Sequence, residues 1–205
     1  MSLENEDDIN RRANEKSARR KAARDKMMAG KTVEKGLLIV HTGTGKGKST
    51  AAFGLALRML GRGHRVGVVQ FIKGAWHTAE RDALEKFGDQ VVWHTMGEGF
   101  TWETQDRARD VAAAARAWAK AQELIADPRF GLVILDELNI ALRYDYLDLA
   151  AIVAALATRR PGLHVVVTGR NAPDELIAAA DLVTEMTLVK HPFRDGVKAQ
   201  PGIEF

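Results

Sequence analysis

The chain has 205 residues, of which 46% are hydrophobic and 28% are charged, and it contains no cysteine. This length suits one well-buried domain, and the composition is that of a globular protein rather than a fibrous or disordered one. The apolar runs are too short to span a bilayer, and the acidic N-terminus is unlike a signal peptide. Disulfides and thiolate metal sites are excluded, so we expect a cytoplasmic protein with no membrane partner.

The positive charge of the chain is concentrated near its N-terminus. The first eight residues carry four acids and no base, whereas residues 9–35 carry ten Lys or Arg against three acids. Because the whole chain has a net charge of +3, residues 36–205 are neutral overall. Such a basic arm either binds a polyanion, such as nucleic acid, or is a solvated extension. It has no aromatic residue for base stacking, and we predict a separate arm over residues 1–35, helical or disordered.

From Gly36 onward, short β-rich runs alternate with helical stretches. Several of these runs are continuously apolar, which is typical of a parallel sheet covered by helices on both faces. The order predicts an α/β fold, doubly wound around a mostly parallel sheet, over residues 36–189. Residues 190–205 are expected to form a tail docked on the same domain. The predicted strands are Leu37–His41, Arg65–Phe71, Val91–His94, Leu132–Leu135, His164–Thr168 and Leu182–Leu188, and the predicted helices are Ser49–Leu60, Thr78–Phe87, Glu103–Ala126, Leu147–Arg159 and Ala172–Ala180.

A glycine-rich loop follows the first predicted strand. Its sequence is "HTGTGKGKST", residues 41–50, and it lies between the apolar run 37–40 and a helical stretch. The usual phosphate-binding loop is Gly, four residues, then Gly-Lys-Ser/Thr. Here Gly47-Lys48-Ser49 ends the motif, but Thr42 stands where the first glycine is usual. Glycines let backbone N–H groups turn toward phosphates, and the helix N-terminus adds positive potential, so we predict a nucleotide site.

Side chains of this loop have distinct expected roles. Lys48 is expected to reach the phosphate chain, and the Ser49 hydroxyl is expected to bind Mg²⁺. Lys46 supplies a second cation within the loop. The six histidines are scattered, so the Mg²⁺ that accompanies the nucleotide is the only metal expected.

Two further predicted strands end in charged residues. The run "GLVILDELN", residues 131–139, ends in Asp136 and Glu137, the usual place for an acidic partner of Mg²⁺. The run "HVVVTGR" ends in Arg170, at the same edge of the sheet, where ligands of open α/β folds bind. Arg170 either contacts substrate or phosphate, or pairs with a surface acid.

These motifs by themselves favour a RecA-like ATPase, in which a carboxylate such as Glu137 activates water and the basic arm binds nucleic acid. That interpretation leaves residues 96–106, "MGEGFTWETQD", unexplained. There Phe100 and Trp102 lie among glycines before the long helix. The two aromatic side chains are either core anchors or an apolar wall for a bulky ligand.

The chain resembles a known family, the P-loop ATP:corrinoid adenosyltransferases. The resemblance covers about residues 10–205 and rests on six segments in order. Thr44 and Ser49 stand where members of the family often carry Asn and Thr, and the second change keeps the hydroxyl. The segments are "TGTGKGKSTAAFG", "VGVVQFIKG", "GFTWETQ", "VILDELNIALRYDYL", "VVVTGR" and "VKHPFRDGVKAQPGIEF".

The resemblance implies a P-loop NTPase fold and a particular reaction. A corrinoid reduced to Co(I) attacks C5′ of ATP, forming a cobalt–carbon bond and releasing triphosphate, in adenosylcobalamin biosynthesis. The cobalt is the nucleophile, so no side chain is needed as one. The implied substrates are ATP and the reduced corrinoid, with Mg²⁺, an electron donor such as a flavoprotein reductase, a homodimer, and no nucleic acid.

The resemblance also assigns roles to residues. Ser49 and Glu137 hold Mg²⁺, Asp136 is a weaker candidate that supports the metal, and Phe100 and Trp102 crowd the lower face of the corrin. The N-terminal helix of the family folds over the active site, which gives the basic arm a role toward corrinoid or phosphate. The ATP-binding residues are Gly43, Thr44, Gly45, Lys46, Gly47, Lys48, Ser49 and Thr50, with Lys48 and Lys46 stabilising charge and Arg170 as a further contact.

Overall fold

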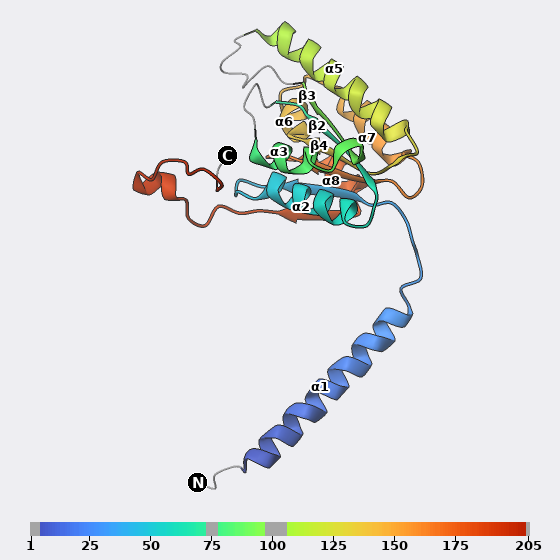
Figure 1. The fold of residues 1–205 in the computed structure, drawn as a ribbon, viewed down its shortest axis with the longest axis vertical. Coiled ribbons are helices and arrows are strands. Elements are labelled where there is room, and N and C mark those ends of the chain that lie inside the picture. The colour runs from blue at the N-terminus through green and yellow to red at the C-terminus, as the bar shows by residue number, and fades with distance from the viewer. Residues whose placement is uncertain (1–4, 73–77, 97–105, 204–205) are drawn as a thin grey trace. The chain divides into compact units, whose positions relative to one another are not determined.

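The structure is a computed structural model that describes residues 5–72, 78–96 and 106–203 (Figure 1). It divides into two compact units, Met1–Glu34 and Lys35–Phe205. The first contains a single helix, and the second contains the sheet and its covering helices.

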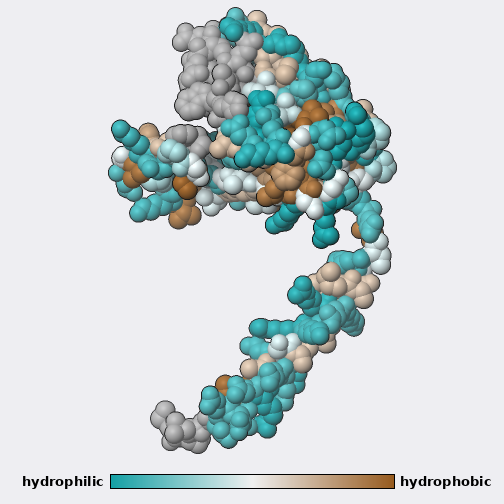
Figure 2. Space-filling model, in the orientation of Figure 1, coloured by the Kyte–Doolittle hydropathy of each residue, from teal (hydrophilic) through white to brown (hydrophobic). Residues whose placement is uncertain are grey.

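The first unit is the helix α1, Glu6–Ala29. Asn5 caps its N-terminus, its side chain accepting a hydrogen bond from the Asp7 N–H, and three acidic residues in the first turn suit the helix dipole. None of its residues is buried, and Figure 2 shows a predominantly hydrophilic surface along its length. The helix therefore has no hydrophobic stripe with which to form a core of its own.

The second unit is built on a six-stranded sheet with the order β3-β2-β4-β5-β1-β6. All five strand pairs are parallel, which confirms the predicted doubly wound α/β class. One strand, β5, lies between β1, which leads into the glycine-rich loop, and β4, which ends in Asp136. The strands are β1 Leu38–Thr42, β2 Arg65–Gln70, β3 Val91–Thr95, β4 Phe130–Asp136, β5 His164–Thr168 and β6 Leu182–Glu185.

Helices cover both faces of this sheet. Alternate residues of β4 point to opposite faces, so that Leu132 and Ile134 join one core and Val133 and Leu135 the other. The helices α2 and α3 bury their apolar residues in the first core, and α5, α6, α7 and α8 in the second (Figure 1). Their bounds are α2 Lys48–Leu60, α3 Ala79–Glu85, α5 Arg107–Ala126, α6 Leu138–Arg143, α7 Leu149–Ala157 and α8 Asp174–Ala179.

The predicted elements agree with the observed ones except at a few places. The sequence analysis missed α6, a short helix that begins directly after the acidic strand. The last strand is shorter than predicted, ending at Glu185 rather than Leu188, and the next residue, Met186, hydrogen-bonds to Thr42 and Gly45 of the glycine-rich loop. The short 3-10 helices Gly88–Gln90 and Pro192–Asp195 were also not predicted. The long helix ends at Ala126, as Asp127-Pro128 predicted.

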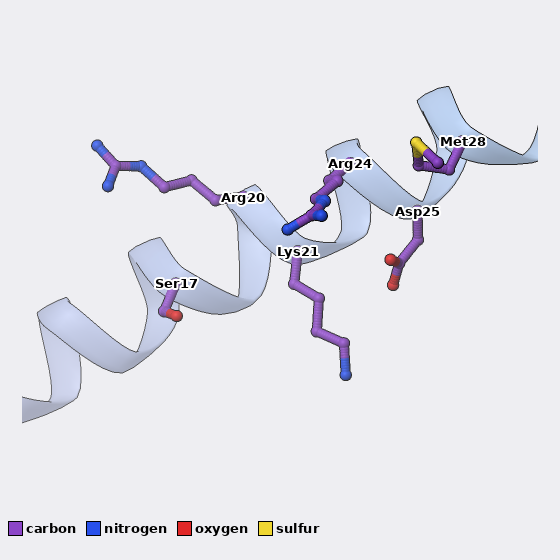
Figure 3. Close-up of a pocket in the computed structure, with 6 residues that line it drawn as sticks. All are labelled: Ser17, Arg20, Lys21, Arg24, Asp25 and Met28. Carbon is purple, nitrogen blue, oxygen red and sulfur yellow. The ribbon is translucent and has the colours of Figure 1, made fainter. Parts of the chain in front are cut away.

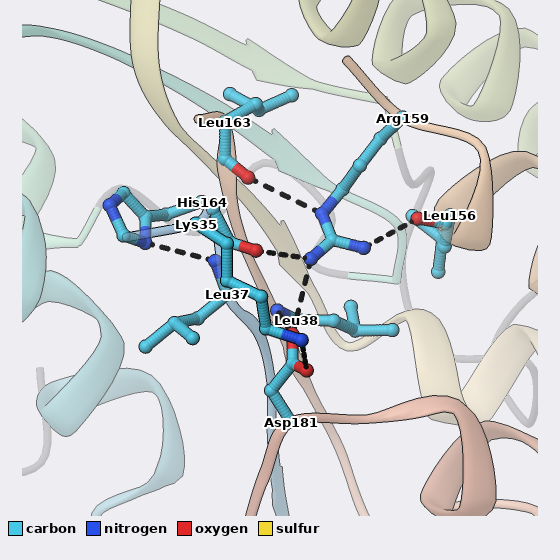
Figure 4. A network of polar contacts seen from close by, with 9 residues as sticks. Lys35, Leu37, Leu38, Leu156, Arg159, Leu163, His164 and Asp181 are labelled. Atoms are coloured by element: carbon cyan, nitrogen blue, oxygen red, sulfur yellow. Dashed lines mark hydrogen bonds and ion pairs between the residues drawn. The ribbon is translucent and has the colours of Figure 1, made fainter. Parts of the chain in front are cut away.

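A polar network holds the amino-terminal edge of the sheet (Figure 4). The Arg159 guanidinium donates to the carbonyls of Gly36 and Leu156, both at 2.7 Å, and to Leu163 at 3.3 Å. It also donates to Asp181 Oδ2 at 3.3 Å, and Asp181 Oδ1 forms an ion pair with Lys35. The ion pair with Lys35 and the Leu38 N–H lower the pKa of Asp181. This network ties the chain segments before β1, β5 and β6 together at the edge opposite the glycine-rich loop.

No helix among the described residues is long and apolar enough to cross a membrane. Within the same residues, no group of three or more His, Asp or Glu side chains is gathered so as to hold a metal ion.

Candidate nucleotide site

The carboxyl ends of the strands bring the predicted site residues to one edge of the sheet. In the parallel register, His41 of β1 lies beside Thr168 of β5, and Gln70 of β2 lies beside Asp136 of β4. The glycine-rich loop follows β1, the acidic pair lies at the end of β4 and just after it, and Arg170 follows β5. Ligands of open α/β sheets bind at this edge.

Backbone packing, more than any ligand, explains two of the loop glycines. Gly43 has φ +94°, and a Cβ there would lie 2.4 Å from the Met186 carbonyl oxygen. A Cβ on Gly45 would lie 2.7 Å from the Thr187 carbonyl oxygen. The Gly45 N–H donates to the Met186 carbonyl at 2.6 Å, so this N–H is engaged by the chain after β6. The loop therefore rests on residues 186–187, a contact that the sequence analysis did not predict.

Lys48 is the buried cation of the loop. Its side chain folds back so that Nζ donates to the carbonyls of Gly43, at 2.9 Å, and Gly45. Burial lowers the pKa of Lys48, the carboxylate of Glu137 raises it, and Arg170 and Lys46 lower it. These electrostatic effects place the acid and both other cations near the Lys48 amine. The Lys48 ammonium donates to two carbonyls here, and it can donate instead to the oxygens of a phosphate, which are stronger acceptors.

The helix α2 begins at Lys48 with no side chain to cap it, since its N-cap residue is Gly47 in the left-handed region at φ +102°. Its first turn carries Ser49, partly buried, and Thr50, exposed. Lys46 and Thr44 are exposed on the loop itself. An uncapped N-terminus beside a lysine attracts an anion through its N–H groups and its dipole.

The acidic pair is divided between two environments. Asp136 is completely buried, and its two carboxylate oxygens accept hydrogen bonds from Thr168 at 2.8 Å and from Gln70 at 3.0 Å. Glu137, one residue on, is only partly buried and adopts a left-handed backbone with φ 61°. Its carboxylate lies close enough to Lys48 to raise the pKa of that amine.

Arg170 lies close enough to the loop to lower the pKa of Lys48, and its own side chain is exposed. The loop that carries it is fixed by two hydrogen bonds, from the Gly169 N–H to the His41 carbonyl at 3.2 Å and from the Ala172 N–H to Thr42 Oγ1 at 3.0 Å. The structure therefore brings Arg170 close to the glycine-rich loop.

Phe100 and Trp102 lie outside the described residues, so their predicted role is not addressed by the structure. The basic arm is described as α1, where Arg20, Lys21 and Arg24 project from the helix in different directions (Figure 3). The residues that the sequence analysis missed are Gln70, Thr168 and Met186. The only signal for the first two was their place at the ends of apolar strands.

The family model of the ATP:corrinoid adenosyltransferases BtuR/CobO/CobP matches residues 34–205 of the chain. The chain belongs to this family. It is 62% identical over 192 residues to a corrinoid adenosyltransferase of Sinorhizobium sp., covering 93% of this chain and 90% of that protein. It is 55% identical over 194 residues to a corrinoid adenosyltransferase of Pseudomonas aeruginosa, covering 95% and 96%. It is 48% identical over 172 residues to the corrinoid adenosyltransferase CobA of Salmonella typhimurium, covering 84% and 87%.

Membership of the ATP:corrinoid adenosyltransferase family makes the chain an enzyme of the transferase class and confirms the resemblance stated from the sequence. The match begins at residue 34, so α1 lies before the part that the family model covers. The loop, the acidic pair and Arg170 all lie within it.

Proposed function

We propose that the chain transfers the 5′-deoxyadenosyl group of ATP to the Co(I) centre of a reduced corrinoid in adenosylcobalamin biosynthesis. The electron pair of Co(I) forms the bond to C5′, and the C5′–O bond breaks with its electron pair going to triphosphate. The observation that carries the proposal is the family match over residues 34–205, which includes the glycine-rich loop, the acidic pair and Arg170.

The proposed role of the loop follows from where charge develops. As the C5′–O bond breaks, negative charge grows on the leaving triphosphate, and groups that stabilise this charge lower the barrier. Lys48 and the N-terminus of α2 are held at the loop before any ligand arrives, so they need little rearrangement. Lys46 and Arg170, both exposed and both close enough to influence Lys48, add further positive charge.

The residues present also fit the Mg²⁺ that the family implies. Mg²⁺ prefers oxygen ligands and usually binds through one or two protein groups together with substrate phosphates. We propose that the Ser49 hydroxyl and the Glu137 carboxylate hold the ion, while Asp136, with both oxygens already hydrogen-bonded, supports them. When bound, the ion neutralises phosphate charge.

We propose that Phe100 and Trp102 displace the lower axial ligand of the corrinoid. Four-coordinate Co(II) is easier to reduce to the Co(I) nucleophile. Removing either ring is therefore expected to slow the reaction that starts from Co(II) more than one that starts from prereduced Co(I). Equal losses in the two assays would contradict this role.

We propose that the basic arm binds the corrinoid or the phosphates. Of the residues between 1 and 30 that the structure describes, none is buried, so the remaining chain is expected to fold after their deletion. Its corrinoid affinity is expected to be weak, and an unchanged affinity would refute the proposed role. We further propose that a flavoprotein reductase supplies the electron and that the enzyme is a cytoplasmic homodimer.

The test of the proposed function is anaerobic. The protein is mixed with MgATP and chemically reduced cob(I)alamin, the Co(I) absorbance is followed, and the released phosphates are assayed. Loss of Co(I), a photolabile organocobalt product and stoichiometric triphosphate are expected. Steady release of ADP without alkylation would instead support an ATPase, and the exposed basic side chains of α1 would then be tested against nucleic acid.

A further inference from the structure

A buried series of hydrogen bonds connects the four neighbouring strands β3, β2, β4 and β5, and it includes Asp136 of the acidic pair. Gln70, at the end of β2, donates through Nε2 to Asp136 Oδ2 at 3.0 Å. Its Oε1 accepts from Trp93 Nε1 at 3.0 Å and from Thr95 Oγ1 at 3.1 Å, both on β3. On the other side, Thr168 of β5 donates to Asp136 Oδ1 at 2.8 Å. Gln70 is 2% exposed, and Asp136 and Thr168 are completely buried.

The chemistry of these groups allows one arrangement of the Gln70 amide. The indole N–H of Trp93 can only donate, and an ionised Asp136 carboxylate can only accept. Gln70 lies between them, so its oxygen must face Trp93 and its NH₂ group must face Asp136. A buried network in which the members satisfy one another is rigid, because breaking one bond leaves a buried polar group without its partner.

Thr168 extends this network to the backbone of Glu137. Its hydroxyl donates to Asp136 and at the same time accepts from the Glu137 N–H at 3.0 Å. Glu137 needs such support because its backbone, at φ 61° and ψ 23°, is left-handed. That conformation is energetically unfavourable for a residue with a side chain.

The left-handed turn directs the Glu137 side chain toward the loop. A Cβ on Gly169 would lie 3.2 Å from Glu137 Oε2, so the side chain runs close over that glycine, which has φ +130°. Gly169 is in turn joined to the strand that leads into the loop, since its N–H donates to the His41 carbonyl at 3.2 Å. The network, the turn and the glycine together determine where the Glu137 carboxylate lies.

We propose that Gln70 and Thr168 are positioning residues for the divalent cation of the nucleotide. They hold Asp136 as a buried anchor, and through it and the Glu137 N–H they place the Glu137 carboxylate where the metal-bound triphosphate arrives. Asp136 serves here as the buried anchor, since it is completely buried and both of its oxygens accept hydrogen bonds from protein groups. This inference depends on the proposed function in one respect, which is that the ligand of the site is a triphosphate with a bound metal ion.

The test measures metal-dependent binding rather than catalysis. Affinities of the full chain for ATP are measured by calorimetry in excess Mg²⁺ and in EDTA, and the ratio of the two dissociation constants is compared between variants. Thr168→Val keeps the shape of the side chain but removes both hydrogen bonds. We expect it to reduce the Mg²⁺-dependent gain in affinity about tenfold or more, the usual effect of losing a group that orients a metal ligand. The affinity in EDTA is expected to change less than about twofold, because the loop contacts remain.

Two companion variants and one control make the test specific. Thr168→Ser keeps the hydroxyl and is expected to restore the metal-dependent gain. Gln70→Glu places an acceptor against Asp136 while keeping the oxygen that faces Trp93, and is expected to reduce the gain as well. Thr158→Val makes the same substitution at an exposed position at the end of α7 and is expected to leave both affinities unchanged. Should Thr168→Val fail to fold by circular dichroism, the Gln70→Glu and Thr168→Ser results decide.

Other results would overturn the inference. A gain in affinity from Mg²⁺ that stays the same in the Thr168→Val and Gln70→Glu variants would show that the network does not position the metal. Equal loss of affinity with and without Mg²⁺ would show a purely structural role. Failure of the proposed function is distinguishable, because these measurements need no corrinoid. A chain that shows the metal effect but does not alkylate cob(I)alamin would refute the transferase proposal while supporting this inference.

Discussion

The two halves of the nucleotide site are built by different means. The glycine-rich loop is held by backbone groups, with Gly43 and Gly45 packed on residues 186–187 and Lys48 bound to loop carbonyls. The acidic edge is held by side chains, in the network from Trp93 through Gln70 and Asp136 to Thr168. Steric changes should therefore damage the loop, whereas loss of a single donor or acceptor should damage the acidic edge.

The largest expected effect is on catalysis at the loop. Lys48→Ala removes the buried cation next to the proposed leaving group, and we expect the adenosylation rate to fall about 10²–10³-fold. Lys46→Ala removes an exposed charge, which solvent screens, so we expect a much smaller loss of about tenfold or less. Both rates are measured with prereduced cob(I)alamin. Equal losses would contradict the distinction between the buried and the exposed lysine.

Gly43→Ala tests the backbone contact of the loop. The new Cβ meets the Met186 carbonyl oxygen, and the residue must also hold φ +94°. We expect the free energy of unfolding to fall by about 2–4 kcal/mol. Gly54→Ala is the matched control, since nothing lies within 4 Å of a Cβ there and the residue is within α2. It is expected to stabilise by about 0.5–1 kcal/mol. Urea denaturation measures both, and equal stabilities would show that residues 186–187 do not constrain the loop.

Arg159→Ala tests whether the acidic edge is independent of the Arg159 network at the opposite, amino-terminal edge of the sheet. The Arg159 side chain is 10% exposed, and its loss leaves the carbonyls of Gly36 and Leu156 without their donor. We expect the free energy of unfolding to fall by about 2–4 kcal/mol. The affinity of the folded variant for MgATP is expected to stay unchanged. A selective loss of MgATP affinity would contradict the view that the two networks act separately.

The smallest expected effect is on the pH dependence of stability. Burial, Arg159 and His64 lower the pKa of His164 below its usual 6.5, and its Nδ1 accepts from the Leu37 N–H. Above that pH neither the folded nor the unfolded chain carries the proton. As the pH falls below it, the unfolded chain is protonated first, so stability falls until the folded pKa is reached.

His164→Asn keeps an acceptor for the Leu37 N–H but does not titrate. Denaturation midpoints of this variant measured from pH 7.5 to 5, about the range over which histidine titrates, are expected to fall less steeply than those of the parent chain. An identical slope in the two proteins would show that His164 does not contribute.

Much of the fold was predictable because its signals are local. Apolar runs identified all six strands, and Asp127-Pro128 identified the end of α5. The short helix α6 was not predicted from the sequence. Its N-cap residue, Glu137, has a left-handed backbone and is not one of the residue types that usually cap a helix N-terminus. The loop, Asp136, Glu137 and Arg170 were named from the sequence, and the structure brings them to one edge of the sheet.

The sequence by itself determined the nucleotide loop, the parallel sheet and the family, since each depends on contiguous segments whose pattern reflects local geometry. Only the tertiary structure revealed that Gln70, Asp136 and Thr168 form one network and that Met186 supports the loop. Gln70 and Asp136 are 66 residues apart, and Asp136 and Thr168 are 32 apart. The order of strands in the sheet makes them neighbours, and hydrogen bonding between side chains on adjacent strands leaves no periodic trace in the sequence.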